Sequence, residues 1–192
     1  MLDPSLAKRL RLVGFDVDGV LSDGGIYVGR VGDHPAEFKR FDSQDGSGAW
    51  LLRRAGLALV FASGRHSDAT IIRAREMQVD EVIEDETGGG SKLMAFEAML
   101  ERRAIAWDEC AFVGDDLADL PLLSRVGLPI AVANAVPEVA AAAAIVTQRS
   151  GGHGVVREVA HTILTARGTW DDVVHQYLEE RGDAAQRTAG SR

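Results

Sequence analysis

Short apolar runs alternate with longer amphipathic segments along most of the chain, and this alternation predicts the fold class. The runs have the length of buried strands, and the segments between them repeat apolar residues at helical spacing. We expect strands at residues 12–15, 57–62, 110–113 and 130–132, and helices at residues 48–55, 68–77, 92–103 and 117–126. Gly56 and Gly127 follow two of these helices, where glycine commonly ends a helix. Strands that alternate with helices predict an α/β fold, a doubly wound parallel sheet with helices on both faces.

One pair of short segments departs from this rhythm. Residues 25–28 and 37–41 partly alternate apolar and polar positions, and residues 29–35 between them include two glycines and a proline. This pattern predicts a small β-hairpin inserted after the first strand. The insert is too short to be a large cap domain.

The C-terminal part is expected to be mostly helical. We expect an alanine-rich helix at residues 137–144, a glycine-rich loop at 150–154, and helices at 155–166 and 170–180. No repeat or linker divides the chain, so residues 1–181 are expected to form a single domain. Residues 182–192 have the composition of a disordered tail.

Composition and charge narrow the class of partners. Of the 192 residues 46% are apolar, and 21 basic against 29 acidic residues give a net charge of −8. That charge disfavours nucleic acid and anionic membranes, although a bound divalent cation would still permit an anionic substrate. The only cysteine, Cys110, lies in an apolar run and is expected to be a buried thiol. Without the apolar core of a secretory signal or a membrane span, the chain is expected to be cytoplasmic.

Two aspartates directly follow the first expected strand. Asp16 and Asp18 are spaced by one residue, and Gly19 lets the chain turn so that both carboxylates can face one pocket. The carboxyl ends of parallel strands are where such sheets bind ligands. Taken alone, the motif could equally be an acidic turn or part of a calcium-binding loop. The following segment, residues 22–24, lacks the further ligands that a calcium loop needs.

The order of the groups that follow makes the motif more specific. Ser63 comes at the end of the next main strand. Lys92 opens a helix after three glycines and a serine, which places its ammonium near an anion-favouring helix N-terminus. Asp115, Asp116 and Asp119 follow the strand expected to end at residue 113. Carboxylates, a hydroxyl, a lysine and carboxylates again thus follow one another along the chain.

This order resembles the four motifs of the haloacid dehalogenase-type phosphatase superfamily, over nearly all of residues 12–166. Within that superfamily, the segments DVDGVLSDG, GDDLADLPLL and GGHGVVREV, together with the short hairpin, resemble the 3-deoxy-D-manno-octulosonate 8-phosphate phosphatases. The resemblance implies a haloacid dehalogenase-like (HAD-like), Rossmann-like fold. It also implies a Mg²⁺-dependent phosphoric monoester hydrolase that acts on a phosphosugar.

The chemistry of phosphoryl transfer assigns roles to the matched residues. Asp16 is expected to be the nucleophile, because a carboxylate can form an acyl-phosphate that splits hydrolysis into two easier steps. Asp18 is expected to donate a proton to the departing sugar oxygen and then to activate water as a base. Ser63 would donate a hydrogen bond to a phosphate oxygen, and Lys92 would pair with the phosphate and with the nucleophile.

The same motifs predict a Mg²⁺ site. Asp16, the backbone carbonyl of Asp18 and Asp115 would hold the ion, with water and substrate oxygens completing an octahedron. Asp116 and Asp119 would orient waters or ligands from outside the coordination shell. Either of these two aspartates could instead cap the helix that follows.

Family substrate contacts carry over to a further set of positions. They are Asp18, Asp42, Ser43, Gln44, Asp45, Gly46, Trp50, Gly64, Arg65, Arg73 and Lys92. Arg65 and Arg73 suit a carboxylate or a phosphate, because a guanidinium binds such groups with two hydrogen bonds. The sequence departs from the family at two positions, where Gln44 and Trp50 replace arginines. Losing two cations weakens recognition of a sugar-acid carboxylate, since each charged hydrogen bond contributes roughly 1.5–3 kcal/mol.

The resemblance also implies an assembly. The small insert leaves the site open to water, and the resembled subfamily covers its sites with neighbouring hairpins and C-terminal tails in a homotetramer. Ile26, Val28, Phe38 and Phe41 would supply apolar side chains to such an interface. His153, in the glycine-rich loop, could lie near a site.

Three alternatives stay open. The substrate could be a nonulosonate 9-phosphate or another phosphosugar, given Gln44 and Trp50. A phosphomutase is disfavoured, because it needs a cap that keeps water from the acyl-phosphate. A non-catalytic assembly module of a sugar-nucleotide pathway is a different class, and turnover of p-nitrophenyl phosphate with Mg²⁺ would distinguish it from an enzyme.

Overall fold

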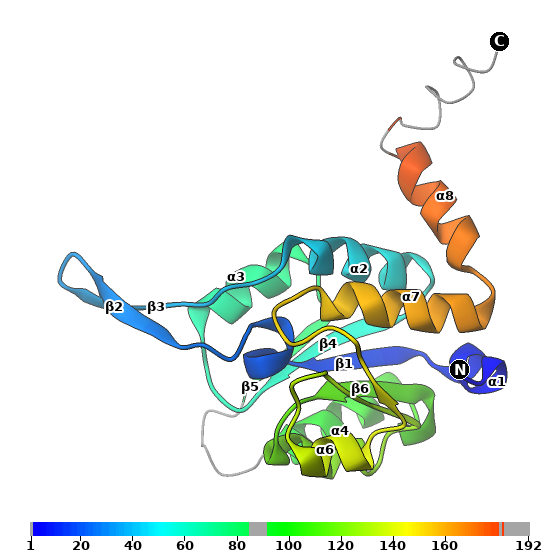
Figure 1. Cartoon of the computed structure of the whole chain (residues 1–192), viewed down its shortest axis with the longest axis horizontal. Coiled ribbons are helices and arrows are strands. Elements are labelled where there is room, and N and C mark those ends of the chain that lie inside the picture. The colour runs from blue at the N-terminus through cyan, green and yellow to red at the C-terminus, as the bar shows by residue number, and fades with distance from the viewer. Residues whose placement is uncertain (1, 85–91, 181, 183–192) are drawn as a thin grey trace.

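The computed structural model describes residues 2–84, 92–180 and 182, and its centre is a six-stranded sheet (Figure 1). The strands lie in the order β5-β4-β1-β6-β7-β8, and each strand is parallel to its neighbours. They are β1 (Leu12–Asp16), β4 (Ala58–Ser63), β5 (Glu81–Glu84), β6 (Cys110–Gly114), β7 (Leu128–Ala131) and β8 (Ile145–Val146). This order places the carboxyl end of β1 between the ends of β4 and β6.

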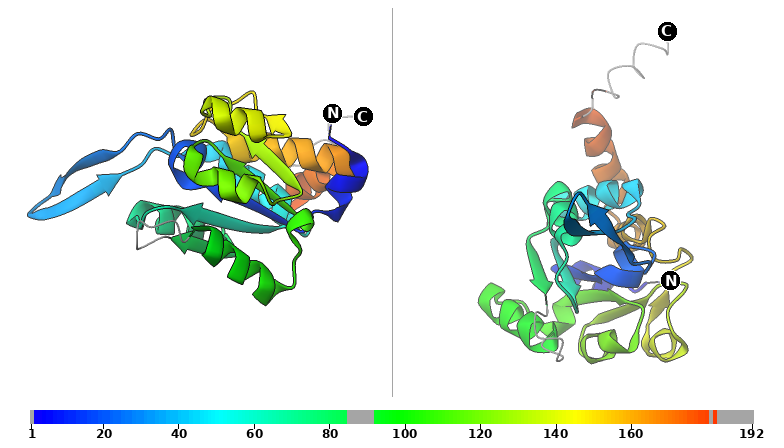
Figure 2. Two further views of the ribbon diagram at one scale, coloured as in Figure 1. Left: turned by 90° about the horizontal axis from the view of Figure 1, so that it is seen from below. Right: turned by 90° about the vertical axis from the view of Figure 1, so that its left-hand side faces the viewer.

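Helices pack on both faces of the sheet (Figures 1 and 2). One face is covered by α2 (Ser43–Arg54), α3 (Asp68–Glu76) and α7 (Val155–Arg167), and α8 (Trp170–Glu180) follows α7. The other face is covered by α4 (Lys92–Arg103), α5 (Leu120–Leu123) and α6 (Pro137–Ala142). Helix α1 (Pro4–Arg9) precedes the sheet, and η1 (Val17–Leu21), η2 (Trp107–Glu109) and η3 (Leu117–Asp119) are short turns of helix.

Alternate residues of β1 supply the two hydrophobic cores. Val13 and Phe15 lie in the core beneath α2 and α7, whereas Leu12 lies in the core on the α4 side. This division follows from the strand geometry, in which successive side chains point to opposite faces. Gly14 also faces the second core, where a Cβ atom would lie 2.7 Å from the Phe112 ring. The buried strands and the two cores confirm the expected α/β fold.

Several element boundaries differ from the prediction. Helix α2 begins at Ser43 rather than at residue 48, because the Asp42 side chain accepts a hydrogen bond from the Gln44 backbone N–H (2.8 Å) and caps the helix. Gly48 belongs inside this helix: a Cβ there would lie 2.6 Å from the backbone nitrogen of Arg157 in α7. The single helix expected at 117–126 is wrong, since η3 and the four-residue α5 occupy that stretch. The strands β5 and β8 and helix α1 were not predicted.

The predicted hairpin is present, with strands β2 (Tyr27–Val31) and β3 (His34–Phe38) in antiparallel register. Its strands are closer in sequence than expected, because Gly32 adopts a positive φ of 60° and completes a two-residue turn between Val31 and His34. The hairpin extends away from the sheet (Figures 1 and 2). Between β1 and α2 the chain forms only η1 and this hairpin, which confirms that no large cap domain stands there.

The apolar residues of the hairpin differ in exposure. Ile26, Val28 and Phe38 are 55%, 78% and 54% exposed, respectively. Phe41 instead packs partly against the core, with the guanidinium of Arg73 5.9 Å from its ring. Three of the four residues expected at an interface are therefore on the surface of a single chain.

The remaining expectations concern Cys110, the membrane and the tail. Cys110 is buried, and burial raises the pKa of its thiol to about 12, so the thiolate is strongly disfavoured. Within the described ranges, no helix is long and apolar enough to cross a membrane. The predicted tail, apart from residue 182, and the glycines and serine before Lys92 lie outside the described residues.

Candidate active site

The carboxyl ends of three neighbouring strands bring acidic and polar side chains together. Asp16 is the last residue of β1, and Ser63 is the last residue of β4 beside it. On the other side, Asp115 directly follows β6. Because neighbouring parallel strands end at the same edge of the sheet, residues almost 100 positions apart in sequence become neighbours in space.

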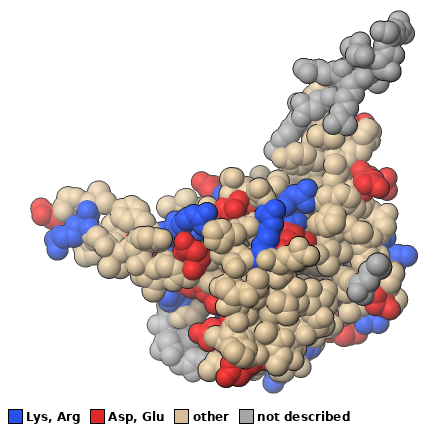
Figure 3. Space-filling model, viewed as in Figure 1, with Lys and Arg blue, Asp and Glu red and all other residues tan. Residues whose placement is uncertain are grey.

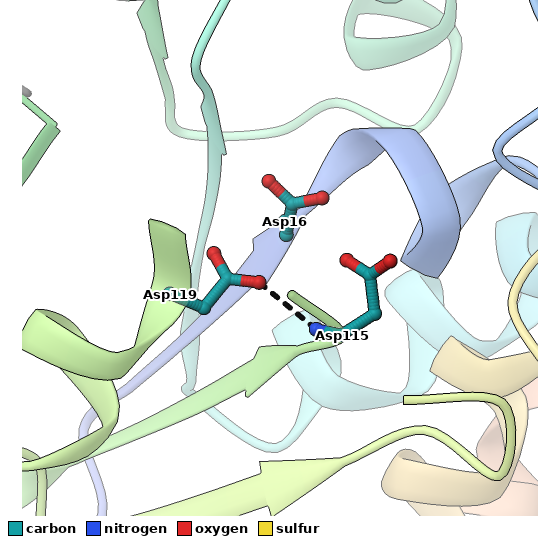
Figure 4. Close-up of side chains that lie close together, drawn as sticks. All are labelled: Asp16, Asp115 and Asp119. Atoms are coloured by element: carbon teal, nitrogen blue, oxygen red, sulfur yellow. Dashed lines mark hydrogen bonds between the residues drawn. The ribbon is translucent and has the colours of Figure 1, made fainter. Parts of the chain in front are cut away.

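Three carboxylates form a compact cluster at this edge (Figure 4). Asp16, Asp115 and Asp119 each offer one oxygen, and these oxygens lie within 4.8 Å of one another. Asp16 is 7% exposed and Asp119 is 1% exposed. Asp119 is held in place by the loop after β6, because one of its oxygens accepts a hydrogen bond from the backbone N–H of Asp115 at 2.9 Å.

Lys92 supplies a positive charge to the cluster. It is the first described residue of α4, it is 6% exposed, and its ammonium lies 2.5 Å from Asp16 Oδ1 and 2.6 Å from Asp119 Oδ1. Burial alone would lower the pKa of Lys92, but the charges of Asp16 and Asp119 outweigh it and raise that pKa. The lysine therefore remains an ammonium at neutral pH.

The carboxylates outnumber this single cation. Burial raises the pKa of Asp16 to about 8, against the opposing charge of Lys92. Burial and the nearby charges of Asp119 and Asp116 raise the pKa of Asp115 to about 7. Because these neighbouring carboxyl groups are costly to ionise together, an additional positive charge beside them stabilises their anionic forms. The electrostatics of the cluster thus favour binding of a cation.

The donor set fits Mg²⁺. Hard divalent cations prefer carboxylate and carbonyl oxygens, and Asp16 and Asp115 present carboxylates from adjacent strand ends. Asp119 already uses one oxygen for Lys92 and the other for the Asp115 N–H. Its geometry therefore suits a residue that orients Asp115 and Lys92, whereas Asp16 and Asp115 are the better candidates for direct ligands.

The loop after β1 packs directly on this cluster. Gly19 has a φ of 101°, and a Cβ atom there would lie 2.0 Å from Asp115 Oδ2. Only glycine allows both the backbone turn and the close approach, so Gly19 positions the loop that carries Asp18. The Asp18 carboxylate forms an ion pair with Lys39 at 2.8 Å.

Comparison with known proteins decides the family. A family model of haloacid dehalogenase-like hydrolases matches residues 81–159. The 3-deoxy-D-manno-octulosonate 8-phosphate phosphatase KdsC of Escherichia coli (strain K12) is 39% identical over 172 residues, which are 90% of this chain and 88% of that protein. This chain belongs to the haloacid dehalogenase-like hydrolase family.

Solved structures similar to this hydrolase have the same fold. The 3-deoxy-D-manno-octulosonate 8-phosphate phosphatase of Moraxella catarrhalis, in complex with a magnesium ion, a phosphate ion and KDO, has 33% identity and a TM-score of 0.83. The match covers 91% of this chain and 97% of that one. The cobalt-bound deoxy-D-mannose-octulosonate 8-phosphate phosphatase of Haemophilus influenzae has 29% identity and a TM-score of 0.77, covering 85% and 92% of the two chains.

Ser63 and Asp116 have local partners in this hydrolase. Ser63 is 1% exposed, and its hydroxyl donates to the backbone carbonyl of Arg65 at 2.8 Å. Its place at the end of β4, beside Asp16, stays compatible with the predicted phosphate contact. The Asp116 carboxylate accepts from the Leu117 N–H at 2.7 Å and caps η3, so Asp116 follows the capping alternative.

The predicted substrate contacts fall into two groups. The N-terminal turn of α2 carries Asp42, Ser43, Gln44, Asp45 and Gly46. Arg73 lies against this turn: its guanidinium donates to the Asp42 carbonyl at 2.7 Å and lies 3.8 Å from where a Cβ on Gly46 would be. Arg65, next to Gly64 after β4, forms an ion pair with Glu37 at the base of the hairpin. His153, whose side chain is exposed, lies in the loop that packs on η1.

Trp50 is placed differently from these residues. It lies in the second half of α2, and its ring packs edge-on against Tyr177 of α8 with 5.0 Å between ring centroids. Within the described residues, no recorded contact joins Trp50 to the acidic cluster. A packing role accounts for an aromatic residue at this position, and the predicted substrate contact gains no support from the geometry.

Sequence reasoning missed three charged residues near the site. Lys39 pairs with Asp18, and Glu37 pairs with Arg65. Arg149 donates to Gln44 Oε1 at 2.6 Å, which brings a guanidinium to a position where relatives were expected to carry their own arginine. Each of these residues looks like an ordinary surface charge in the sequence, and no spacing rule links it to its partner.

Asp45 gives this hydrolase a specific pH dependence of stability. Its carboxyl is 1% exposed and accepts the Val156 N–H at 2.9 Å, and burial raises its pKa from 3.8 to about 7. Between about pH 4 and 7 the folded chain keeps a proton that the unfolded chain releases, so the Asp45 carboxyl makes the free energy of unfolding fall as pH rises.

We expect Asp45→Asn, which retains an acceptor for the Val156 N–H, to remove this contribution. The free energy of unfolding of the variant should then fall by about 3 kcal/mol less than that of the wild type between about pH 4 and 7. Urea unfolding at several pH values measures this difference. Parallel profiles for the two proteins would contradict it.

Proposed function

We propose that this chain is a Mg²⁺-dependent phosphatase that hydrolyses a phosphorylated sugar acid, 3-deoxy-D-manno-octulosonate 8-phosphate or a close relative of it. The observation that carries the proposal is the buried contact of Lys92 with Asp16 beside Asp115, at the end of the central strand. It is supported by the similarity to phosphatases of that substrate over 90% of the chain.

Asp16 is the proposed nucleophile. One of its oxygens bonds to the phosphorus atom, the bond from phosphorus to the sugar oxygen breaks, and an aspartyl-phosphate forms on Asp16. Lys92 contacts Asp16 and can neutralise a phosphate oxygen beside it, and Ser63 can donate to another phosphate oxygen. Asp16, the carbonyl of Asp18 and Asp115 would hold Mg²⁺, which supplies charge neutralisation for the phosphate oxygens when bound.

Asp18 completes both half-reactions. It gives a proton to the sugar oxygen as that oxygen departs, and the resulting carboxylate then takes a proton from the attacking water. Water attacks the phosphorus of the aspartyl-phosphate, which releases inorganic phosphate and restores Asp16. Asp119 keeps Lys92 and the Asp115 backbone in place through the two steps.

The substrate assignment depends on how the carboxylate of the sugar acid is recognised. Gln44 and Trp50 stand where relatives were expected to have arginines, which favours a nonulosonate 9-phosphate as the second candidate. Arg149 supports a sugar acid in either case, because it places a guanidinium 2.6 Å from Gln44 at the N-terminus of α2. Arg65 and Arg73 are the other proposed contacts.

We also propose that the protein is a cytoplasmic homotetramer in which residues 1–181 form one domain. The exposure of Ile26, Val28 and Phe38 on a hairpin that projects from the sheet supports burial against other copies (Figure 3 shows the largely uncharged surface of the hairpin). The buried, unpaired Cys110 is compatible with a reducing compartment. Light scattering measures the mass of the assembly directly.

A substrate panel tests the proposed function. With Mg²⁺ present, we expect kcat/KM for phosphorylated eight- and nine-carbon sugar acids to exceed that for neutral sugar phosphates by about 10²-fold, because a sugar-acid carboxylate adds charged hydrogen bonds. EDTA should abolish turnover, and Mg²⁺ should restore it. Preference for neutral sugar phosphates would contradict the substrate class, and no turnover of any phosphate ester would contradict the enzyme itself.

A further inference from the structure

A buried lysine at the base of the hairpin contacts the proposed acid–base residue. Lys39 follows β3 directly, and its side chain is fully buried. Its ammonium lies 2.8 Å from one oxygen of the Asp18 carboxylate and 3.0 Å from the other. Asp18 comes from the loop after β1, so the contact joins two segments that are 21 residues apart.

Lys39 is the main influence on the orientation of the Asp18 side chain. Among the described residues, the hydrogen bond from Lys39 is the only one recorded for the Asp18 carboxylate. Without it, none of the residues that the structure describes would hydrogen-bond the Asp18 carboxylate and restrain its rotation. A side chain that must reach the departing oxygen of a substrate gains rate from being held in a productive orientation.

Other contacts hold Lys39 itself in place. Its ammonium lies 3.3 Å from the Thr70 hydroxyl in α3 and 3.8 Å from Glu37 in β3. Glu37 accepts a hydrogen bond from the Ser67 hydroxyl at 3.0 Å and pairs with Arg65. Charges therefore alternate along the row Asp18, Lys39, Glu37, Arg65, and the row fixes the base of the hairpin against α3.

We propose that Lys39 is a positioning residue, which holds the Asp18 carboxyl group where its protonated form can donate a proton to the departing oxygen. The inference rests on the proposed function, because it assigns Asp18 the role of general acid. It gives the hairpin a part in the reaction within its own chain, since the hairpin carries the residue that orients Asp18. The alternative is that Lys39 only anchors the hairpin to the sheet.

Substrates with two different leaving groups distinguish the positioning role of Lys39 from a purely anchoring role. A sugar or alkyl oxygen needs a proton as it departs, whereas p-nitrophenolate departs readily without one. The quantity kcat/KM reports on phosphoryl transfer up to departure of that group, so it isolates the proton-donating step from the later attack of water. We expect Lys39→Met to lower kcat/KM for sugar phosphates by about 10²-fold and that for p-nitrophenyl phosphate by less than about threefold.

Matched variants complete the test. Arg40→Met removes the neighbouring cation, which also anchors the hairpin base through a hydrogen bond to the Gly152 carbonyl at 2.9 Å but does not contact Asp18. We expect it to leave the ratio of the two kcat/KM values unchanged, and Lys39→Arg to restore most of that ratio. Should Lys39→Met not fold, Thr70→Val replaces it, because losing the hydroxyl that holds the ammonium should shift the ratio in the same direction.

An equal loss of kcat/KM for both substrates in Lys39→Met would overturn the positioning role and leave Lys39 only as an anchor of the hairpin. The same change in the ratio of the two kcat/KM values in Arg40→Met would also overturn it. If Lys39→Met does not fold and Thr70→Val is used instead, an unchanged ratio of the two kcat/KM values in Thr70→Val overturns the positioning role. These outcomes are distinct from failure of the proposed function, which would appear as a wild-type protein without Mg²⁺-dependent turnover of either substrate.

Discussion

Asp16→Asn is expected to lower kcat for phosphate esters by about 10⁴-fold or more, because it removes the proposed nucleophile, on which the aspartyl-phosphate would form. An amide is a far weaker nucleophile than a carboxylate, and it also offers a poorer ligand to a divalent cation. The fold should survive the change, since Lys92 keeps its contact with Asp119 at 2.6 Å and the buried cluster loses one negative charge. Steady-state turnover with saturating Mg²⁺ measures the effect, and thermal unfolding checks the fold.

Asp33→Asn is the matched control for this substitution. Asp33 is exposed in the turn of the hairpin, and the same loss of one carboxylate there should change kcat by less than about twofold. A second readout is the covalent intermediate: wild-type protein mixed with substrate and quenched in acid should carry phosphate on Asp16, and the variant should carry none. Residual activity of Asp16→Asn within tenfold of wild type would remove Asp16 as the nucleophile.

Lys92→Met is expected to have the largest effect on stability. The ammonium lies 2.5 Å from Asp16 and 2.6 Å from Asp119, and both carboxylates are buried. Removing one member of a buried ion pair leaves an uncompensated charge and typically lowers the free energy of unfolding by about 3–5 kcal/mol. We expect a loss of that size in urea unfolding without divalent cations, together with a fall of about 10²-fold or more in kcat/KM.

Added Mg²⁺ and a second substitution distinguish the loss of the Lys92 charge from the loss of its packing as the cause of the lower stability. Added Mg²⁺ should restore part of the stability of Lys92→Met, because the ion supplies a positive charge to the same carboxylates. The double variant Lys92→Met/Asp119→Asn should lose less than the two single variants together, since it removes both members of the pair. Lys8→Met, an exposed lysine in α1, should change stability by no more than about 0.5 kcal/mol. Strict additivity in the double variant would show that the Lys92–Asp119 contact contributes nothing specific.

The sequence alone predicted much of this architecture because the relevant signals are local. Apolar runs located the central strands, and helical spacing located α4 and α8 with the bounds that the structure has. The order of strand-end carboxylates, hydroxyl and lysine then placed Asp16, Ser63, Lys92 and Asp115 at one edge of the sheet. For Asp16, Ser63 and Asp115 that inference needs only the rule that parallel strands end together, whereas Lys92 was placed by the helix that it opens and by the resemblance to the superfamily.

Some contacts depend on neighbours that are distant in the sequence, and the sequence did not predict these contacts. Gly48 was expected to begin a helix, but it lies inside α2, where α7 approaches so closely that a side chain would collide with Arg157. Trp50 stays a predicted substrate contact, and the structure adds that its ring packs against Tyr177. In both cases the decisive partner is more than 100 residues away along the chain.

The division between sequence and tertiary structure is sharpest within the site. Motif spacing gave Asp116 and Asp119 the same two possible roles. In the structure both side chains belong to the capping box of η3, and Asp119 also contacts Lys92 and the Asp115 backbone. Lys39 carries no sequence signal at all, yet its ammonium lies 2.8 Å from the Asp18 carboxylate. The sequence by itself determined the central strands, the fold class and the chemistry available at the strand ends, because those follow from local periodicity and chain order. Only the tertiary structure decided which charges are buried together, because burial and pairing depend on how distant segments pack.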